Sequence, residues 1–298
     1  MKMSNTEKQL KKILVALTAL TALTSLTSHY LERPFLLKME RKQGIRMKLA
    51  ELKKMNLGLV ELDCKLAREG RDISEYLVRP EFKIYDFKKP ETSKNNNHNK
   101  SKNIYLAPEF GFYTEKSFEQ MIDFYRRNEK FLREVEKNNN IRGAAKYIVA
   151  TYQIESNFGK KTGRRHVFNT LVSMYVQNHR KDFAYNELKD FLSLQGELYE
   201  DIFEIKGSKY GAFGDGQMIA STYKKSYRDF NGDGKANIFC REDAMGFIAD
   251  YFAKSGFREN PRKALHLYNH SWKYVDAIET VAKELGTKLE QKKKRGKA

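Results

Sequence analysis

The chain has 298 residues, enough for one large or two ordinary domains, and its 12% aromatic residues, 5 Pro and 18 Gly exclude wholesale disorder and collagen-like structure. Two cysteines, Cys64 and Cys240, exclude a disulfide scaffold but suffice for a single bridge. Lys and Arg number 56 against 38 Asp and Glu; the formal net charge of +18 favours nucleic acid, anionic lipid or an anionic cell-wall polymer as partner, unless it reflects only a lysine-rich composition.

The N-terminal segment has the pattern of a targeting sequence. Four lysines among the first 12 residues precede residues 13–31, which contain no Asp, Glu, Lys or Arg. A basic start followed by an apolar run is typical of a secretory signal, and this run is just long enough to span a bilayer. Residues 1–34 are therefore predicted to be a signal peptide or an N-terminal membrane anchor that directs export. Cleavage is left open because Leu26 fits a cleavage site poorly, and a buried amphipathic helix is the alternative.

Residues 35–103 are predicted to form a helical region that ends in a polar linker. Apolar side chains recur at steps of three or four over residues 35–75, which is the period of one helix face. They are Ile45, Leu49, Leu52, Met55, Leu59, Leu62 and Leu66. Residues 88–103 are rich in Lys and Asn and nearly devoid of apolar side chains, as expected of a linker or loop.

From residue 104 onward the pattern becomes globular. The apolar spacing from Phe118 to Phe131 predicts one helix, and neither a strand pair nor a solenoid repeat is evident. The main body is therefore predicted to be mostly α.

Residues 141–158 carry a carboxylate on an apolar helix face. The stripe formed by Ile141, Ala144, Ala145, Ile148, Val149 and Tyr152 continues three residues later onto Glu155. Loss of hydration at such a position favours the neutral carboxyl group and raises its pKa, which suits a group that protonates a leaving oxygen. The alternative is a structural Glu at a helix end, paired with Lys160 or Lys161.

Residues 229–243 form an Asp-rich loop. Asp229, Asn231 and Asp233 occupy alternate positions and a glycine follows, which matches the first half of a calcium loop with Lys235 offering its carbonyl oxygen. The twelfth position, where a bidentate Glu is expected, is Cys240. The pattern favours a cation site, and a plain turn rich in Asp and Asn is the alternative.

Five short blocks, in the same order, resemble the lytic murein transglycosylase B family. They are TYQIESNFGKKTG at 151–163, KGSKYGAFG at 206–214 with GQM at 216–218 and STY at 221–223, the Asp-rich loop, ADYF at 249–252 with GF at 256–257, and YNHSWKY at 268–274. The block after Gln217 lacks the usual proline. The stretch between Phe257 and Tyr268 is shorter than in many relatives, which implies that a small accessory lobe is missing.

The resemblance implies a lysozyme-like helical catalytic domain with an EF-hand-like loop over residues 104–285, followed by a basic tail over residues 286–298. It implies cleavage of the β-1,4 bond between N-acetylmuramic acid and N-acetylglucosamine in peptidoglycan, with a 1,6-anhydromuramyl product and no catalytic cofactor. The partner is then the glycan strand, with the membrane as a second partner through the N-terminus and no specific nucleic acid. The expected location is the periplasm or cell envelope, with or without an inner-membrane anchor, and the expected state is a monomer.

Residue roles follow from the same resemblance. Glu155 corresponds to the single acid and base. The positions that line the cleft or hold the sugars are Ser208, Gln217, Tyr251, Asn269 and Tyr274. The calcium loop of the family takes its final carboxylate from a later Asp, here Asp243, which completes a ligand set of Asp229, Asn231, Asp233, Lys235 and Asp243.

Three other functions are weighed against this one. A hydrolytic muramidase on the same fold needs a second carboxylate, for which Asp182, Glu187 and Asp215 are candidates only by default. A non-catalytic protein that binds cell wall or calcium is the second alternative, and Glu155 argues against it. A nucleic-acid binder is the third, and no motif of basic and aromatic residues specifies bases.

Overall fold

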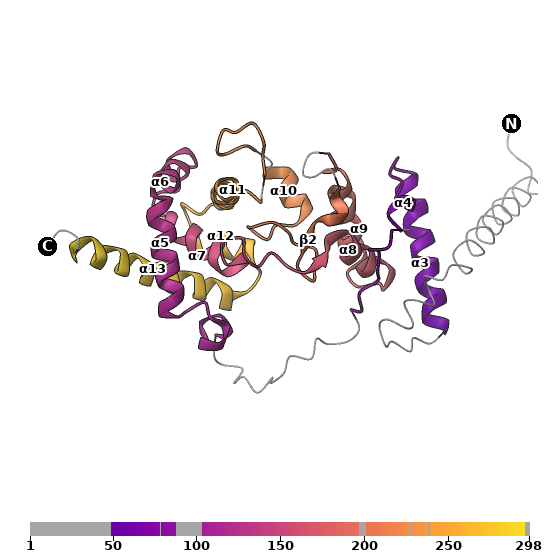
Figure 1. Cartoon of the computed structure of the whole chain (residues 1–298), viewed down its shortest axis with the longest axis horizontal. Coiled ribbons are helices and arrows are strands. Elements are labelled where there is room, and N and C mark those ends of the chain that lie inside the picture. Colours follow the sequence, from indigo (N-terminus) through magenta and orange to yellow (C-terminus); the bar gives the residue numbers. More distant parts are fainter. Residues whose placement is uncertain are drawn as a thin grey trace, which may run out of the picture. The chain divides into compact units, whose positions relative to one another are not determined.

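The computed structural model describes residues 49–77, 79–87, 103–196, 201–226, 228–237 and 239–295 (Figure 1). The predicted signal or anchor segment and most of the Lys/Asn-rich linker lie outside these residues. The chain divides into two compact units, Met1–Leu57 and Gly58–Ala298, and most of the described residues belong to the second. In the part of the chain that is described, no helix combines the length and the apolar character needed to cross a membrane.

The described part is mostly α, as predicted from the sequence. Its helices are α3 (Leu49–Ala67), α4 (Ser74–Leu77), α5 (Glu115–Arg127), α6 (Glu129–Asn138), α7 (Ala145–Ser156), α8 (Val167–Val176), α9 (Lys181–Leu192), α10 (Ala220–Ser226), α11 (Arg241–Lys254), α12 (Pro261–Tyr268) and α13 (Trp272–Arg295). Short 3-10 turns are η1 (Ile104–Leu106), η2 (Pro108–Phe110) and η3 (Ile202–Glu204). Strands β1 (Arg165–His166) and β2 (Lys206–Gly207) form one antiparallel pair.

Helix α7 is the centre of the domain and packs against α5, α6, α11 and α13. The six apolar residues of its predicted stripe, from Ile141 to Tyr152, are all at most 3% exposed. Helix α13 buries Val275, Ile278 and Val281 completely. Full burial of such a side chain contributes about 1.5–3 kcal/mol, so the helix that carries Glu155 is anchored by the main core.

Three sequence expectations about element boundaries were wrong. The helix predicted over residues 35–75 ends at Ala67, because the chain turns at Gly70, where φ is +73°. The helix predicted from Phe118 to Phe131 is two helices, since the backbone leaves helical geometry at Asn128, whose side-chain amide donates to a carbonyl of the last turn of α5. The strand pair escaped notice because two residues per strand are too few for a period-two pattern.

The structure also answers two questions that the sequence raised, about the cysteines and about the basic C-terminal segment. Cys64 and Cys240 are both free thiols, so they form no bridge with each other. The basic segment predicted as a tail over residues 286–298 continues α13 as far as Arg295.

Candidate active site

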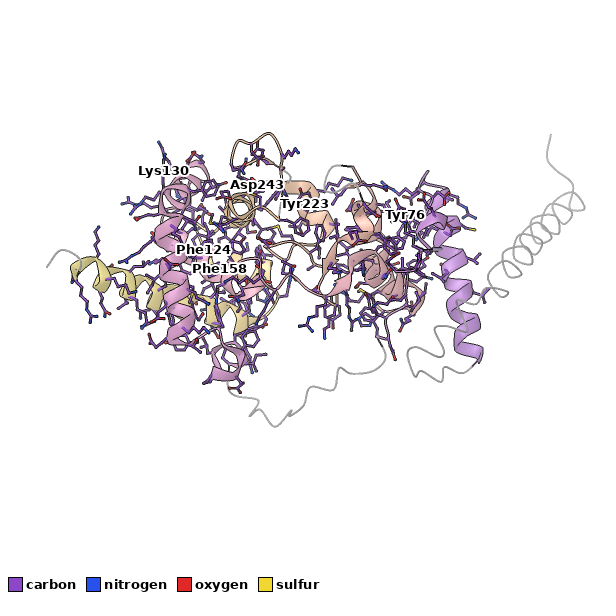
Figure 2. The ribbon with its side chains drawn as sticks, viewed as in Figure 1. Tyr76, Phe124, Lys130, Phe158, Tyr223 and Asp243 are labelled. Carbon is purple, nitrogen blue, oxygen red and sulfur yellow. The ribbon has the colours of Figure 1, made fainter. Side chains whose placement is uncertain are left out.

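Glu155 lies at the C-terminal end of α7, one residue before the helix stops. The stop is abrupt because Asn157, Phe158 and Gly159 all have positive φ, at 51°, 57° and 78°. The ring of Phe158 stacks on that of Phe124 with a centroid distance of 4.2 Å (Figure 2). Positive φ is unfavourable for residues other than glycine, so this packing holds the turn, and with it the end of the helix, in one conformation.

The carboxyl group of Glu155 is half-buried and has one hydrogen-bond donor. The hydroxyl of Tyr274, which is 1% exposed, donates to its Oε1 at 2.7 Å. The ring of Tyr105 packs edge-on against that of Tyr274 at 5.8 Å and helps to exclude water. Burial raises the pKa of Glu155 to about 7, while the hydrogen bond from Tyr274 opposes the rise. At neutral pH the group is therefore close to half protonated and can both donate and accept a proton.

The structural alternative for Glu155 required an ion pair at a helix end. Glu155 forms no salt bridge with Lys160 or Lys161, all three of which lie in the described part of the chain. The backbone N–H of Lys161 instead closes the turn on the carbonyl of Ser156 at 2.7 Å. An unpaired, partly desolvated carboxyl group is typical of a proton-transfer site.

Gln217 lies on a tight loop that is tied to the end of α7. Its φ is +50°, and its Nε2 donates to the carbonyls of Thr162 at 2.8 Å and Gly214 at 3.0 Å. The neighbouring Asp215 accepts a hydrogen bond from the hydroxyl of Tyr152 on α7. The amide nitrogen of Gln217 is thus occupied in positioning this loop.

Two glycines allow the loop segments to approach α7 closely. A Cβ on Gly159 would lie 2.5 Å from a carboxylate oxygen of Asp215, and one on Gly163 would lie 2.0 Å from the carbonyl oxygen of Gly207. Both positions also have positive φ. The family pattern of two glycines after the Glu therefore has a steric reason in this chain.

Ser208 organises the turn that follows β2. Its Oγ accepts hydrogen bonds from the N–H groups of Ala212 at 3.1 Å and Tyr210 at 3.3 Å. The turn leads into the Gln217 loop. Neither Ser208 nor Gln217 makes a direct contact with Glu155 among the hydrogen bonds of the described residues.

Tyr251 on α11 contacts the last turn of α12, which Asn269 ends. The hydroxyl of Tyr251 donates to the carbonyl of Leu267 at 2.8 Å, and its ring packs edge-on against Tyr268 at 5.1 Å. Tyr268 in turn donates to the carbonyl of Gly216. Asn269 is half-buried and ends α12.

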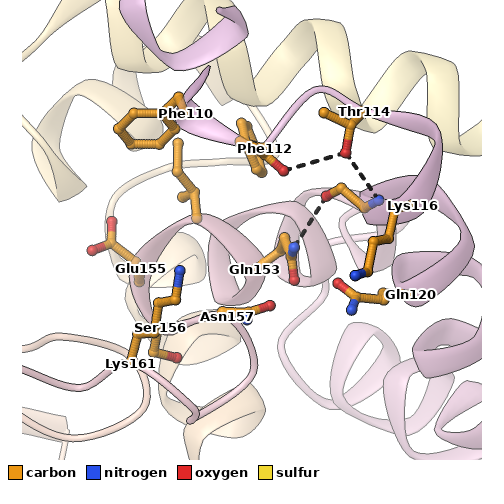
Figure 3. Close-up of a pocket in the computed structure, with 13 residues that line it drawn as sticks. Phe110, Phe112, Thr114, Lys116, Gln120, Gln153, Glu155, Ser156, Asn157 and Lys161 are labelled. Carbon is orange, nitrogen blue, oxygen red and sulfur yellow. Dashed lines mark hydrogen bonds between the residues drawn. The ribbon is translucent and has the colours of Figure 1, made fainter. Parts of the chain in front are cut away.

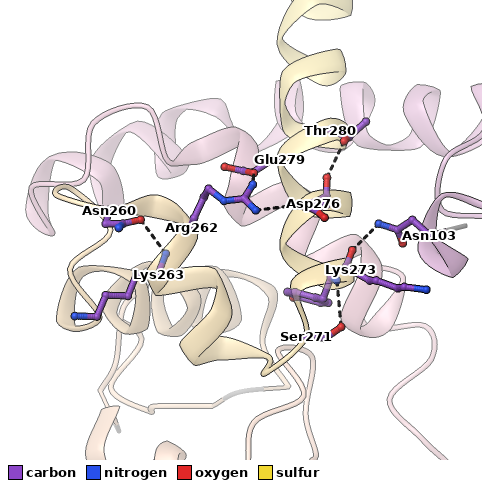
Figure 4. Close-up of polar contacts among 10 residues, drawn as sticks. Asn103, Asn260, Arg262, Lys263, Ser271, Lys273, Asp276, Glu279 and Thr280 are labelled. Atoms are coloured by element: carbon purple, nitrogen blue, oxygen red, sulfur yellow. Dashed lines mark hydrogen bonds and ion pairs between the residues drawn. The ribbon is translucent and has the colours of Figure 1, made fainter. Parts of the chain in front are cut away.

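Ion pairs brace the corner between α12 and α13. Arg262 on α12 contacts Asp276 at 2.8 Å and Glu279, both on α13 (Figure 4). The side-chain amide of Asn103 donates to the carbonyl of Lys273 at 2.7 Å. Of the five residues expected to hold substrate, Tyr274 alone contacts Glu155, and the other four shape the loops and the corner around it.

A cavity of about 550 Å³ opens beside Glu155 (Figure 3). It lies between the end of α7 and the N-terminal end of α5, and sequence reasoning missed it. Its lining includes Phe110, Phe112, Thr114, Lys116, Ser117, Gln120, Gln153, Glu155, Asn157 and Lys161. The one sequence signal for this cavity is Gln153, a polar residue next to the apolar stripe. In the structure Gln153 is 8% exposed.

Asp182, one of the three other carboxylates considered for catalysis, is exposed in the first turn of α9. The other two have structural partners. Glu187 accepts from the hydroxyl of Ser221 at 2.6 Å and from its N–H at 3.0 Å. Asp215 is hydrogen-bonded to Tyr152, and burial raises its pKa. Neither forms a pair with Glu155, so the geometry offers one acid rather than two facing carboxylates.

In the Asp-rich loop, carboxylate groups accept hydrogen bonds from backbone N–H groups of the same loop. Asp229 accepts from Gly232 N–H at 2.6 Å and Gly234 N–H at 2.7 Å, and these backbone bonds lower its pKa. Asp243 is fully buried and accepts three backbone N–H bonds, the shortest from Asn237 at 2.7 Å; burial nevertheless raises its pKa.

The loop contains the oxygen donors that a cation needs, but they are not arranged around a common centre. Its oxygens are the donors that calcium takes, and a carboxylate oxygen can accept a second interaction. Asn231 and Asp233 bond to each other at 3.0 Å, and Asn231 also contacts the Cys240 thiol. Within the described ranges, no three His, Cys, Asp or Glu side chains lie close enough to hold a metal ion.

Comparison with known proteins defines the class. The sequence profile of the transglycosylase SLT domain matches residues 68–292, most of the chain, and the chain belongs to this family. Membrane-bound lytic murein transglycosylase B of Escherichia coli strain K12 is 31% identical over 119 residues, which are 40% of this chain. The match spans about one third of that relative, or 33% of its length.

Two solved structures share the fold. The Escherichia coli lytic transglycosylase SLT35 in complex with calcium has a TM-score of 0.57 and 20% identity, covering 62% of this chain and 79% of that one. SltB3 of Pseudomonas aeruginosa in complex with NAG-anhNAM-pentapeptide has a TM-score of 0.55 and 20% identity, covering 59% and 65%. The predicted family and the lysozyme-like helical fold are thus confirmed.

Proposed function

We propose that this protein is a peptidoglycan lytic transglycosylase that cleaves the β-1,4 bond between N-acetylmuramic acid and N-acetylglucosamine. The observation that carries the proposal is the pKa of about 7 that burial gives Glu155 at the rim of a cavity. Family membership and the muropeptide bound by the SltB3 relative support the same substrate.

The reaction requires one group to serve first as acid and then as base. Protonated Glu155 gives its proton to the glycosidic oxygen, and the bond from that oxygen to the muramyl anomeric carbon breaks. The family resemblance implies that the muramyl acetamide assists at this carbon. The carboxylate of Glu155 then takes the proton of the muramyl 6-hydroxyl, whose oxygen bonds to the anomeric carbon. No water is consumed, and Glu155 ends protonated as it began.

The neighbours of Glu155 serve this double role. Tyr274 fixes the carboxyl group through Oε1 and keeps the pKa from rising further, so that the ionised form remains accessible. Ser208, Gln217, Tyr251 and Asn269 are proposed to line the sugar path through the loops and the corner that they shape.

Product analysis tests the function directly. Purified peptidoglycan is digested with the protein, and the products are separated and weighed by mass spectrometry. Anhydromuramyl ends, lighter by one water than reducing ends, are expected. Products with reducing ends only would support the muramidase alternative. That alternative needs a second carboxylate, and Asp215 and Glu187 are bonded elsewhere. No digestion by a folded protein that still binds the wall would support the non-catalytic alternative.

A structural calcium ion in the loop of residues 229–243 is part of the proposal. Its ligands are Asp229, Asn231, Asp233 and Asp243 with the carbonyl of Lys235, and a bound cation would brace the start of α11. The donor chemistry of the loop and the calcium complex of the SLT35 relative support this assignment. Catalysis itself uses no cofactor.

Export to the periplasm or cell envelope is also proposed, with the N-terminal segment as signal or membrane anchor and the protein as a monomer. The membrane-bound name of the Escherichia coli relative supports an envelope location. Fusing residues 1–40 to a reporter that is active only outside the cytoplasm tests export, and a silent reporter would contradict it.

A further inference from the structure

A second pocket lies on the solvent-facing side of α12, where this helix leads into α13. Its volume is about 390 Å³, within the range of ligand pockets in proteins. None of its lining residues also lines the cavity beside Glu155. This Trp272 pocket is therefore a site of its own, outside the reaction centre. It is lined by Asn260, Arg262, Lys263, His266, Leu267 and Trp272.

Trp272, the only tryptophan of the chain, is both exposed and held in place. It is 55% exposed, although the imidazole of His266 stacks on its ring with a centroid distance of 4.3 Å and an interplanar angle of 23°. The guanidinium of Arg262 lies 5.7 Å from the ring centroid. A single exposed apolar side chain is ordinary on a protein surface. A ring that is already ordered by its neighbours beside a pocket is different, because a ligand can bind it with little loss of side-chain entropy.

The pocket is polar without requiring an anion. The charge of Arg262 is balanced by Asp276 at 2.8 Å and by Glu279 (Figure 4). Lys263 is exposed to solvent, where a charge needs no partner. The Oδ1 of Asn260 accepts the N–H of Lys263 at 3.0 Å, which leaves the amide NH2 group as a donor. These features favour a ligand that combines an apolar face with neutral hydroxyl or amide groups.

The pocket adjoins the corner that is expected to hold the sugars. Leu267 lines the pocket, and its carbonyl accepts the hydroxyl of Tyr251 at 2.8 Å. The next residue, Tyr268, donates to the carbonyl of Gly216 in the loop that carries Gln217. The Trp272 pocket and the proposed sugar path are thus built on the same turn of α12. A polymer that occupies the path can therefore extend into the pocket.

We propose that the Trp272 pocket binds an N-acetylhexosamine ring of the glycan strand at a distance from the bond that is cleaved. The apolar C–H face of the sugar lies on the indole, and its acetamide carbonyl accepts the NH2 group of Asn260. A sugar hydroxyl bonds to the imidazole of His266, whose nitrogens donate or accept according to the tautomer. Such a second contact holds the enzyme on its polymer, because the strand then binds at two linked sites. The inference rests on the proposed function for the identity of the strand, but it does not depend on cleavage.

The single tryptophan makes occupancy of the pocket directly measurable. Glycan strands freed of their peptides are titrated into Glu155→Gln, which is expected to bind them without cleavage, and the tryptophan emission should shift and saturate. In the same background, Trp272→Ala should bind the strands about tenfold more weakly by calorimetry, as expected when one aromatic anchor is removed. Trp272→Tyr should retain most of the affinity. Leu57→Ala, at an exposed apolar position of α3, is the matched control and should bind as its parent does.

The kinetics of the active enzyme give a second measurement. Trp272→Ala should raise the KM for long strands by about tenfold and leave kcat unchanged, because the pocket contributes binding and no chemistry. Fragments too short to reach from Glu155 to the pocket should be cleaved as by the wild type.

The outcomes separate this inference from the function on which it rests. An unchanged tryptophan emission, or full strand affinity in Trp272→Ala, contradicts the glycan site. An equal loss on short fragments contradicts a separate site and places Trp272 at the reaction centre. Emission that responds to vesicles of phosphatidylglycerol and phosphatidylethanolamine, and not to strands, contradicts it in favour of a membrane surface. Strands that bind at Trp272 without being cleaved by the wild type support the site and contradict the transglycosylase function alone. Melting curves check that the variants are folded.

Discussion

Glu155 at the end of α7 and Asp229 in the Asp-rich loop are both carboxylates, but their surroundings shift their pKa in opposite directions. Glu155 is half-buried, has one hydroxyl donor, and has a pKa raised to about 7. Asp229 is also half-buried, but it accepts several backbone N–H bonds and has a lowered pKa. The balance between burial and N–H donors thus sets the direction of a carboxylate's pKa shift: the fully buried Asp243 of the same loop has a raised pKa despite three N–H bonds.

The largest expected effect concerns Glu155→Gln. The variant keeps the shape of the side chain but has no transferable proton, so turnover of peptidoglycan should fall by a factor of about 10² to 10⁴. Binding should persist, and the melting temperature should equal or exceed that of the wild type, because a neutral amide replaces a desolvated carboxyl group. Glu119→Gln, at an exposed position of α5, is the matched control. Near-normal turnover would refute the mechanism, and unfolding would make Glu155 a structural residue.

The second effect is on stability as a function of pH. Since Glu155 has a raised pKa in the folded state, the folded protein holds a proton between pH 4.5 and 7 that the unfolded chain releases. The free energy of unfolding of the wild type should therefore fall relative to Glu155→Gln as pH rises through this window. The full shift corresponds to about 3 kcal/mol, and partial exposure reduces this to about 1–2 kcal/mol. Denaturant unfolding at several pH values measures it; parallel curves would show that Glu155 is not desolvated.

The third effect concerns the other carboxylate region. Calcium at a hundred times its dissociation constant should stabilise the protein by about 2.7 kcal/mol and raise the melting temperature. Asp233→Ala should abolish the rise, because it removes one of the proposed ligands. Asp123→Ala, at an exposed position on α5, should leave the rise intact. If all three proteins respond alike to calcium, the loop is only a turn.

The smallest effect is expected from Tyr274→Phe, which removes the one donor to Glu155. A hydrogen bond contributes about 0.5–1.5 kcal/mol, so the pKa of Glu155 should rise by up to about one unit. The alkaline limb of the pH–rate profile should move upward, because the acid form survives to higher pH. Tyr125→Phe, a half-buried tyrosine away from the site, should not move it. An unchanged profile would show that Tyr274 does not tune the acid.

The sequence singles out Glu155 because its position continues a helical stripe whose other members are buried, and periodicity is a local property. It predicted Tyr274 only through the family resemblance, because Glu155 and Tyr274 lie 119 positions apart. The cavity beside Glu155 was missed for a similar reason: its lining comes from two stretches of the chain that lie together only once α5 packs beside α7. Local backbone geometry explains the wrong helix ends at Gly70 and Asn128, since no periodic pattern marks a single residue with a non-helical conformation.

The bond between Glu155 and Tyr274 also orders events during synthesis and folding. Glu155 is synthesised long before Tyr274. The chain must close a loop of more than a hundred residues before the two side chains come into contact. Until α13 docks along α7, Glu155 has neither its donor nor its desolvating cover, so its pKa should stay near that of a free glutamate. The raised pKa of Glu155 therefore depends on completed folding, and a chain in which α13 has not yet packed should have no activity.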